Sequence, residues 1–426
     1  MSRLGGLALD LRPLQLDRDF RLVWAGQLVS NLGRQVTVIA LPFQLYVLTG
    51  SPLAIGALAL VQLGPLLAFS LAGGAIADAV DRRRLLLVTQ LGLAAASAIL
   101  AWLAMLGSPP VWALYVVAFG AATISAIDQP ARTSAIPRLV PRERLAPAIA
   151  INQAGFQTAA VVGPAIGGLL IASIGLPAAY AVDAVTFGAS LAALFAIAPI
   201  PPFHGAARPG LAAVLEGLRF ARRMPVILAT FVVDLDAMIF GMPEALFPVL
   251  ALDVFRAGPM GVGFLAAAPA AGALIGALLT GWVGRVRMQG RAVVFAVGAW
   301  GLAITAFGLA TFSFPLALLL LAVAGGADVL SAVFRSTIVQ LATPDGLRGR
   351  VSALHLMVVT GGPRVGDMEA AGVAALVGAQ ASVVSGGVLC LLGLAVVAWR
   401  LPQLWRYDAH VGAAARVGAL GEGAGT

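Results

Sequence analysis

Residues 52–84 read PLAIGALALVQLGPLLAFSLAGGAIADAVDRRR, a long run of apolar side chains that ends in a basic cluster. Within it, residues 53–77 carry no charge. A helix needs about 20 apolar residues to cross the roughly 30 Å hydrocarbon core of a bilayer. The stretch therefore predicts one membrane crossing that stops at the three arginines.

Similar stretches follow one another along the chain. Of the 426 residues, 60% are hydrophobic and 11% are charged, and the mean hydropathy is +0.96. Soluble proteins carry about 25% charged residues. We therefore expect an all-α membrane protein with twelve transmembrane helices. Their approximate ranges are 22–48, 53–77, 85–106, 111–132, 148–172, 178–199, 225–250, 260–283, 292–312, 316–341, 352–377 and 382–400.

The arginines predict the orientation. All 27 basic residues are arginines. Of these, 21 fall in the N-terminal segment, the C-terminal segment or the loops after even-numbered helices, and Arg400 ends the last predicted helix on the same side. Positively charged segments stay on the cytoplasmic side, which places both termini in the cytoplasm. This layout explains the net charge of +8 by topology and contact with membrane lipids rather than by nucleic-acid binding. Cys390 is the single cysteine, which excludes an intramolecular disulfide.

The two halves of the chain share a pattern. Four residues of the first half recur 207 residues later, and two others recur 203 residues later, in matching helix and loop positions. The pairs are Pro52 and Pro259, Gly56 and Gly263, Gly74 and Gly281, Arg84 and Arg291, Arg132 and Arg335, and Pro141 and Pro344. The pattern predicts two pseudo-symmetric bundles of six helices, with the substrate site near the midplane between them.

This repeat divides the chain into five parts. The bundles occupy 22–199 and 225–400, between a cytoplasmic N-terminal tail, 1–21, and a cytoplasmic tail, 401–426. A cytoplasmic linker, 200–224, joins them. Its second part places Leu211, Leu215 and Leu218 on one helical face, which predicts a helix in the membrane interface. A plain solvated linker is the alternative.

The loop after the second helix, from Gly74 to Arg84, resembles the cytoplasmic signature of the major facilitator superfamily. That signature has a glycine, an aspartate four residues later, and then a basic cluster. The matching residues are Gly74, Asp78, Arg82 and Arg84, while Ala79 and Asp81 depart from the pattern. The resemblance implies the twelve-helix major facilitator fold and a cytoplasmic gate at this loop. The second half keeps Gly281 but has Arg285 at the acidic position, so the two copies differ in charge.

The fifth helix resembles a motif of proton-coupled drug antiporters. Its matching residues are Gly163, Pro164, Gly167 and Gly168, with Ala159 where the motif has its first glycine. Small residues allow close helix packing, and proline bends a helix. The resemblance implies export rather than uptake.

Five strings resemble the bacterial enterobactin-exporter family of the superfamily, over residues 19 to about 407. They imply a proton-driven exporter of an amphipathic small organic molecule, drug-like or siderophore-like, in the bacterial cytoplasmic membrane. The strings are residues 26–33, 48–56, 128–132, 335–340 and 344–350.

Several charged residues fall inside predicted helices, where a lone charge costs roughly 2.5–3.5 kcal/mol. Arg34 and Asp234 lie near the midplane at about 1.5 Å per residue. We expect Asp234 to carry the coupled proton, with Arg34 as its partner across the two halves. Asp236 is the alternative carrier, and a permanent pair that only orients helices is another reading. Asp128 with Arg132, and Asp328 with Arg335, share helix faces and are expected at the cytoplasmic gate. For Asp128 and Arg132, a merely local ion pair is the alternative.

Candidate substrate contacts are polar or flexible side chains on helices expected to line the cavity: Gln27, Asn31, Gln44, Gln157 and Met238. Packing and interhelical bonding are the alternatives for each. We expect no enzyme activity, no metal and no cofactor, and a chain without lysine has no Gly-Lys nucleotide loop. The expected partners are a small-molecule substrate, protons and lipids, and we expect a monomer. Nutrient or lipid uptake and a transport-inactive sensor or scaffold are the alternative functions.

Overall fold

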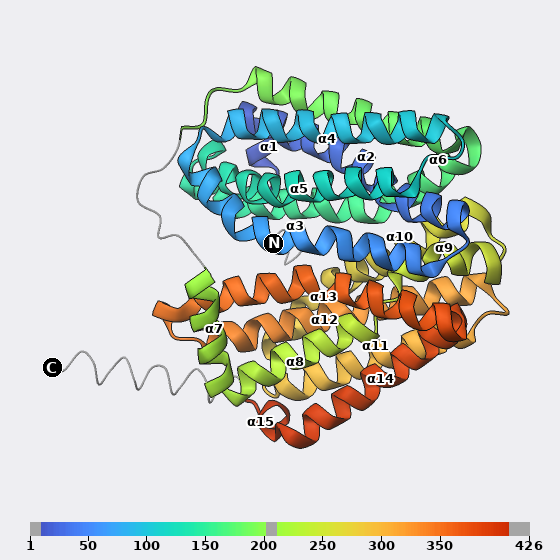
Figure 1. Ribbon diagram of the computed structural model, residues 1–426. Coiled ribbons are helices and arrows are strands. Elements are labelled where there is room, and N and C mark those ends of the chain that lie inside the picture. The colour runs from blue at the N-terminus through green and yellow to red at the C-terminus, as the bar shows by residue number, and fades with distance from the viewer. Residues whose placement is uncertain (1–9, 202–210, 409–426) are drawn as a thin grey trace, which may run out of the picture. The chain divides into compact units, whose positions relative to one another are not determined.

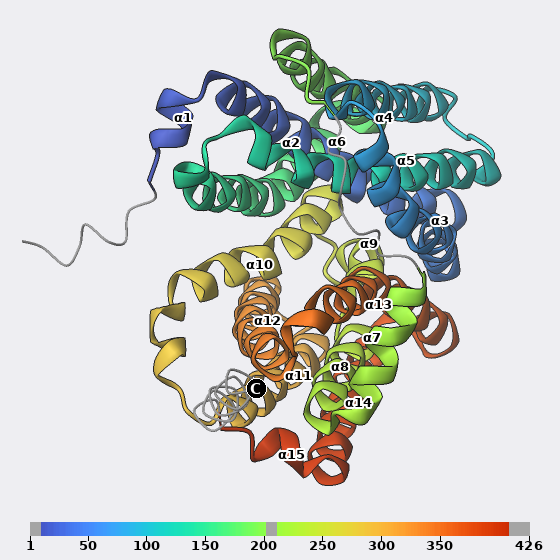
Figure 2. The same ribbon diagram turned by 90° about the vertical axis from the view of Figure 1, so that its left-hand side faces the viewer.

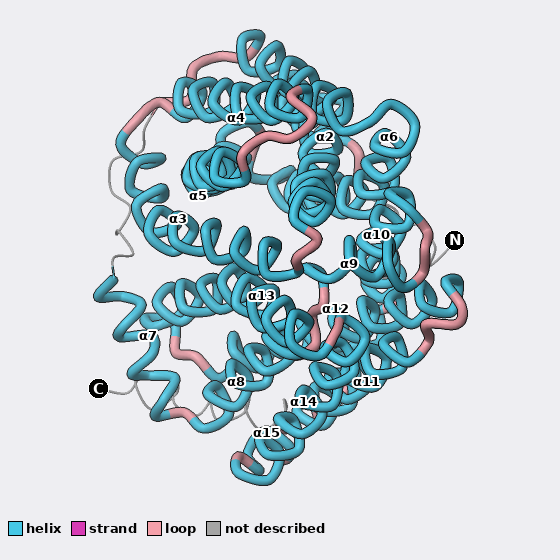
Figure 3. Tube along the Cα trace, turned by 45° about the vertical axis from the view of Figure 1, so that its right-hand side comes forward, coloured by secondary structure: helices cyan, strands magenta, loops and turns pink. Residues whose placement is uncertain are grey.

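The computed structural model describes residues 10–201 and 211–408, with side chains at 70–79, 211–213, 284 and 345 left out. The described residues are almost entirely helical, joined by short loops (Figure 3). The expected all-α class is confirmed. The side chains of Gly74 and Asp78, the ends of both tails and the middle of the expected linker lie outside the described residues.

Between residues 10 and 201 the structure has six α-helices, labelled in Figure 1. Helix α2 packs along α6, and α4 packs against both α5 and α6. The helices are α1 (Arg12–Leu16), α2 (Arg18–Thr49), α3 (Pro52–Ala79), α4 (Arg82–Met105), α5 (Val111–Leu139) and α6 (Leu145–Ala196).

The second half begins with a 13-residue helix that packs on α8 and α13 (Figure 2). Its helices are α7 (Leu211–Arg223), α8 (Pro225–Phe240), α9 (Phe247–Val249), α10 (Gly258–Leu278), α11 (Gln289–Leu309), α12 (Phe314–Ala342), α13 (Arg348–Val377), α14 (Ala379–Arg400) and α15 (Pro402–Trp405). Helix α9 lies between a 3-10 helix at Glu244–Leu246 and a π-helical turn at Leu250–Val254, and another 3-10 helix covers Thr280–Arg285.

These elements form two compact units. Unit 1 comprises Met1–Gly50, Val61–Arg208 and Ala257–Ala267, and unit 2 comprises the remainder. Each unit thus includes the first part of one helix from the other half of the chain. The division of the chain into two six-helix bundles at 22–199 and 225–400 stays a prediction.

Nine helices in the described part of the chain are long and apolar enough to cross a membrane. The span Arg142–Ala196 covers two predicted crossings, 148–172 and 178–199. Between them, Gly175 interrupts α6 at φ 79° and ψ 172°. Glycine tolerates this left-handed geometry, and Pro177 follows it. Helices α2 and α13 are also long, but they are not among the nine. Both carry several charged residues, including Arg34 and Asp367.

The repeat in the sequence has a counterpart in packing. A side chain at Gly163 of α6 would meet the Leu32 carbonyl oxygen of α2 at 3.3 Å. A side chain at Gly366 of α13 would meet the Ile239 carbonyl oxygen of α8 at 3.0 Å. Gly366 follows Gly163 by 203 residues, and Ile239 follows Leu32 by 207. The contact between α2 and α6 in the first half and the contact between α8 and α13 in the second half therefore involve equivalent positions of the repeat.

The glycines of the α6 motif pack against two different helices within unit 1. Gly167 faces the backbone of Val36 in α2. A side chain at Gly168 would meet the Pro259 carbonyl oxygen at 2.8 Å and the Gly263 Cα atom at 3.1 Å, both in α10. Close backbone contact of this kind requires glycine on both sides.

Helix α7 confirms a helix in the second part of the expected linker. It buries Val214 and Ala221, while Leu215 and Leu218 are exposed. Gly217 lies against the backbone of Arg350 in α13. Its position at the membrane surface stays a prediction.

Candidate functional site

The basic cluster after α3 is packed rather than loose. Arg82 is 4% exposed. Its Nε donates to the Ser134 hydroxyl oxygen of α5 at 2.9 Å. Arg83, which was not among the predicted site residues, donates to the Leu194 carbonyl oxygen at 2.6 Å. Arg84 is exposed. Two arginines therefore tie this cluster to neighbouring helices, and the gating role stays a prediction.

Asp128 and Arg132 form an ion pair on α5 through Arg132 Nε, and their expected role at the gate stays a prediction. Asp128 is 1% exposed and accepts two further hydrogen bonds from α4, from Thr89 Oγ1 at 2.6 Å and Gln90 Nε2 at 2.9 Å. A buried carboxylate with three partners is well satisfied. This pair therefore acts first as a structural link between α4 and α5.

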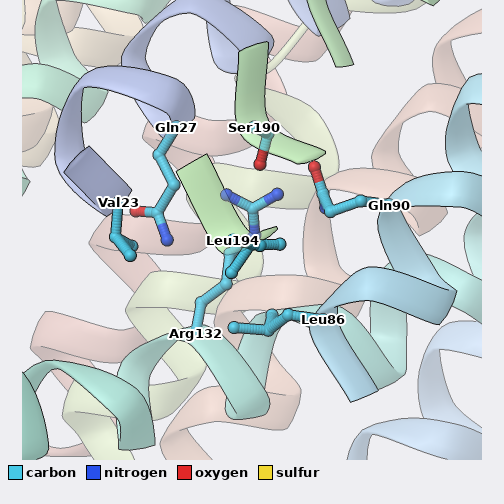
Figure 4. Close-up of a pocket in the computed structure, with 7 residues that line it drawn as sticks. All are labelled: Val23, Gln27, Leu86, Gln90, Arg132, Ser190 and Leu194. Carbon is cyan, nitrogen blue, oxygen red and sulfur yellow. The ribbon is translucent and has the colours of Figure 1, made fainter. Parts of the chain in front are cut away.

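A small pocket surrounds the head of Arg132. Figure 4 shows its guanidinium between Gln27 of α2, Ser190 of α6 and Gln90 of α4. Arg132 Nη1 is buried and has no hydrogen-bond partner among the described residues. This nitrogen can donate a hydrogen bond to a further acceptor.

A larger cavity, about 70 Å³ in volume, adjoins the same arginine in unit 1. It contains two of the five expected substrate contacts, Gln27 and Asn31, together with Arg34. Its remaining lining residues are Gln129, Arg132, Thr133, Ile136, Asn152 and Phe156.

The other expected substrate contacts lie elsewhere. Gln44 is 3% exposed and accepts a hydrogen bond from the Tyr180 hydroxyl at 2.8 Å, which accounts for its burial. Gln157 is half-buried and is not part of either cavity lining. Met238 is buried in unit 2, against Gly362 of α13.

Asp183 of α6 is a buried carboxylate in unit 1 that was not among the predicted site residues. It is 1% exposed and accepts hydrogen bonds from Thr37 Oγ1 and from Ser97 Oγ at 2.7 Å. Arg34 interacts with it electrostatically. Arg34 therefore has an acidic neighbour in its own unit.

Asp234 has a partner in unit 2 that was not predicted. Its Oδ1 lies 3.0 Å from Arg335 Nη2 of α12, and both side chains are almost fully buried. The same Nη2 lies 3.4 Å from Asp328 Oδ1. The structure therefore pairs Asp234 with Arg335 inside unit 2, and the expected partnership with Arg34 of unit 1 stays a prediction. Residue spacing within one helix cannot identify an arginine on another helix, and for this reason Arg335 was assigned only to the gate.

His355 of α13 completes this cluster. It interacts electrostatically with Asp234 and Arg335, and its ring lies 5.9 Å from that of Phe231. His355 was not among the predicted site residues. We refer to Asp234, Asp328, Arg335 and His355 as the charged cluster.

The charged cluster has few hydrogen bonds for its burial. Apart from the ion pair with Arg335, neither Asp234 oxygen has a hydrogen-bond partner among the described residues. The same holds for Arg335 Nε and Nη1 and for His355 Nδ1. Ser331, one turn before Arg335, is fully buried, and its Oγ also has no hydrogen-bond partner among the described residues. Buried polar groups left in this state are costly, and such sites commonly hold ordered water.

Asp236, the alternative proton carrier, faces another side of α8. It lies against Gly393 of α14, and its Oδ2 has no hydrogen-bond partner among the described residues. Positions two apart on a helix point in different directions, so Asp234 and Asp236 belong to separate environments.

A second group of charges lies where α8 ends. Asp367 Oδ1 accepts a hydrogen bond from the Ala245 amide at 3.0 Å, and Asp367 Oδ2 lies 3.4 Å from Arg364 Nη1. Glu244 interacts electrostatically with Arg364 and Asp328. Helix α13 is thus fastened to the turn that follows α8.

The two units carry equivalent sets of residues with different chemistry. By the repeat offsets, Gln27 and Asn152 correspond to Asp234 and His355. The arginine is retained, as Arg132 in unit 1 and Arg335 in unit 2. Unit 1 therefore has neutral amides where unit 2 has groups that can exchange a proton.

Known proteins support this description. A sequence family described as transmembrane secretion effector matches residues 10–414. The enterobactin exporter EntS of Escherichia coli O1:K1 is 27% identical over 387 residues, covering 91% of this chain and 92% of the exporter.

Solved structures show the same fold. A bacterial homologue of the human lysosomal transporter Spinster, in an inward-facing and unoccupied conformation, has a TM-score of 0.71 at 16% identity, covering 91% of this chain and 98% of its own. A POT family transporter in complex with 5-aminolevulinic acid also has a TM-score of 0.71, at 10% identity, covering 91% of this chain and 97% of its own. From these matches and its membrane-type helices, the chain belongs to the transmembrane secretion effector family and is an integral membrane transporter of the major facilitator superfamily.

Proposed function

We propose that this protein exports an amphipathic small organic molecule across the bacterial cytoplasmic membrane in exchange for protons, by alternating access. The proposed topology has twelve crossings in two six-helix bundles, with both termini in the cytoplasm. The full-length similarity to an enterobactin exporter supports export, and the position of the arginines supports the topology.

The charged cluster of unit 2 is the observation that carries proton coupling. With both carboxylates ionised, Asp234, Asp328 and Arg335 bear a net charge of −1. Burial strongly disfavours a net charge, whereas one added proton makes the three residues neutral. The cluster therefore suits the binding of one proton when it is dry, and its release when water reaches it.

Asp234 is the carboxylate best placed to hold that proton. It is 1% exposed, whereas Asp328 is 34% exposed. Protonation of Asp234 would weaken its attraction to Arg335, and Arg335 would then pair with Asp328 alone. A proton shifts an access equilibrium only by binding the two states with different affinity. An ion pair that differs between the two states supplies such a difference.

His355 offers a route toward the cytoplasm. It is seven residues from Arg348, or about 10 Å along the helix axis. In the proposed topology His355 therefore lies between the midplane and the cytoplasmic end of α13. Histidine exchanges protons readily near neutral pH. We assign it a relay role between Asp234 and the cytoplasm.

The test is substrate-dependent collapse of a pH gradient in proteoliposomes with an acidic interior, over siderophores, dyes and antibiotics. Enterobactin, the cargo named for the relative, is the first compound to add. Proton efflux coupled to accumulation of the compound inside supports export by antiport. Compound movement in the same direction as protons would indicate uptake instead, and the absence of coupled flux over the whole panel would indicate a sensor or scaffold.

A further inference from the structure

The cavity of about 70 Å³ in unit 1 has an unusual lining for a membrane interior. Two arginines, Arg34 of α2 and Arg132 of α5, face it together. No carboxylate is among the described side chains that line it. Four amides and one hydroxyl accompany the arginines: Gln27, Asn31, Gln129, Asn152 and Thr133.

The acids that neutralise these arginines lie outside the lining. Asp128 binds Arg132 through Nε and is held from the α4 side by Thr89 and Gln90. Asp183 is held by Thr37 and Ser97. Each carboxylate is therefore engaged away from the cavity. The cavity itself presents cations and amide groups, so its potential favours a negative charge.

Arg132 also has donor capacity to spare. Its Nη1 is buried without a hydrogen-bond partner among the described residues. A buried guanidinium donor without a partner costs free energy, and a carboxylate, sulfonate or phosphate oxygen would supply a charge-assisted bond.

We propose that this cavity is a subsite for the anionic group of the transported molecule, so that the substrate class is organic anions. The volume suits a carboxylate-sized group with a few waters, since an engineered cavity that binds benzene measures about 150 Å³. The rest of the molecule would extend beyond the subsite. Phe156, 45% exposed, offers an apolar surface at its edge.

This inference rests on the proposed function, because it names the substrate of the same transporter. It separates the two tasks between the units. Unit 1, with Gln27 and Asn152, holds an anion without exchanging protons. Unit 2, with Asp234 and His355 at the equivalent positions, exchanges protons. Binding to unit 1 is therefore measurable without proton transport.

The experiment compares benzoate with benzamide, which share a shape and differ in charge. Thermal unfolding of the purified transporter is followed as each compound is added at constant ionic strength, because a ligand of the folded state raises the unfolding temperature. We expect benzoate to stabilise the protein with an apparent affinity at least about tenfold above that of benzamide. Equal effects of the two compounds would overturn the proposal.

Three variants locate the site. Arg34→Gln removes one lining charge, and Asn152→Asp adds an opposing charge without removing an arginine. Both should abolish the preference for benzoate. Arg138→Gln makes the same charge change on an exposed turn of α5, away from the cavity, and should retain it. A benzoate preference that survives both Arg34→Gln and Asn152→Asp would contradict the proposal, even if one variant folds poorly.

A further variant distinguishes this inference from the proposed function. Asp234→Asn should keep the benzoate preference while it loses proton-driven flux. Loss of the preference in Asp234→Asn would show that the anion effect arises in unit 2, and would refute the subsite. Retained flux in Asp234→Asn, together with an intact preference, would refute proton coupling at Asp234 and leave the subsite standing.

Discussion

Nη2 of Arg335 lies 3.0 Å from Oδ1 of Asp234 and 3.4 Å from Oδ1 of Asp328, so one guanidinium group serves two carboxylates. Arg335 is 3% exposed. An arrangement of two acids and one base inside a protein is stable only with further hydrogen bonds or a bound proton. This relationship is the basis for placing proton exchange in unit 2.

Loss of Arg335 should destabilise the protein more than loss of the whole pair. Arg335→Gln leaves two carboxylates without their cation, which costs about 3–5 kcal/mol for a buried pair. The double variant Asp234→Asn with Arg335→Gln removes both charges and should recover part of that loss. Thermal unfolding in detergent measures both. Destabilisation in the double variant equal to the sum of the effects of Asp234→Asn and Arg335→Gln measured singly would argue against coupling between these residues.

Two glycines of α13 should respond in opposite directions to the same change. A methyl group at Gly366 would lie 2.3 Å from the Met238 carbonyl oxygen, so Gly366→Ala must shift backbone and should cost about 1–3 kcal/mol. Gly372 has open space around the same position, so Gly372→Ala should stabilise by about 0.5–1 kcal/mol through helix propensity. Unfolding temperatures test the pair, and a neutral Gly366→Ala would contradict the helix contact.

The α6 motif gives a parallel test in unit 1. Gly168→Ala would place a methyl group 2.8 Å from the Pro259 carbonyl oxygen of α10 and should reduce both stability and transport. Gly188→Ala, on the same long helix with open space, serves as its control. If both variants behave alike, the close approach of α6 and α10 is not required.

Asp367 should hold the turn after α8. Its Oδ1 accepts from the Ala245 amide at 3.0 Å. Asp367→Ala removes the acceptor, so hydrogen exchange of the amides at residues 244–250 should speed up. Asp367→Asn keeps a carbonyl oxygen there and should preserve protection. Faster exchange in both variants would mean that the charge near Arg364, rather than the hydrogen bond, fixes the turn.

The sequence contained enough to predict the membrane class and the helices. Apolar length requires a membrane crossing whatever the neighbours are, so the stretch from Pro52 onward lies in α3, and the other apolar stretches fall largely on helical segments. Gly175 and Pro177 marked the break inside α6 in the same local way.

The partners of the charged residues were harder to predict, because they depend on how helices pack. Asp128 and Arg132 are one helical turn apart, so their spacing alone allows the local ion pair that the structure contains. Asp234 and Arg335 lie on different helices, and their distance follows only from the packing of α8 against α12. His355 carried a signal that was overlooked, since the offset of 203 aligns it with Asn152, a lining residue of the unit 1 cavity.

The most direct test of proton coupling compares wild-type protein with Asp234→Asn in proteoliposomes that have an acidic interior. The rise in interior pH is recorded when a compound that the wild-type protein transports is added outside. We predict a rapid rise for the wild type and none above protein-free liposomes for Asp234→Asn, while the variant still binds benzoate. A rise at the wild-type rate in Asp234→Asn would contradict the account.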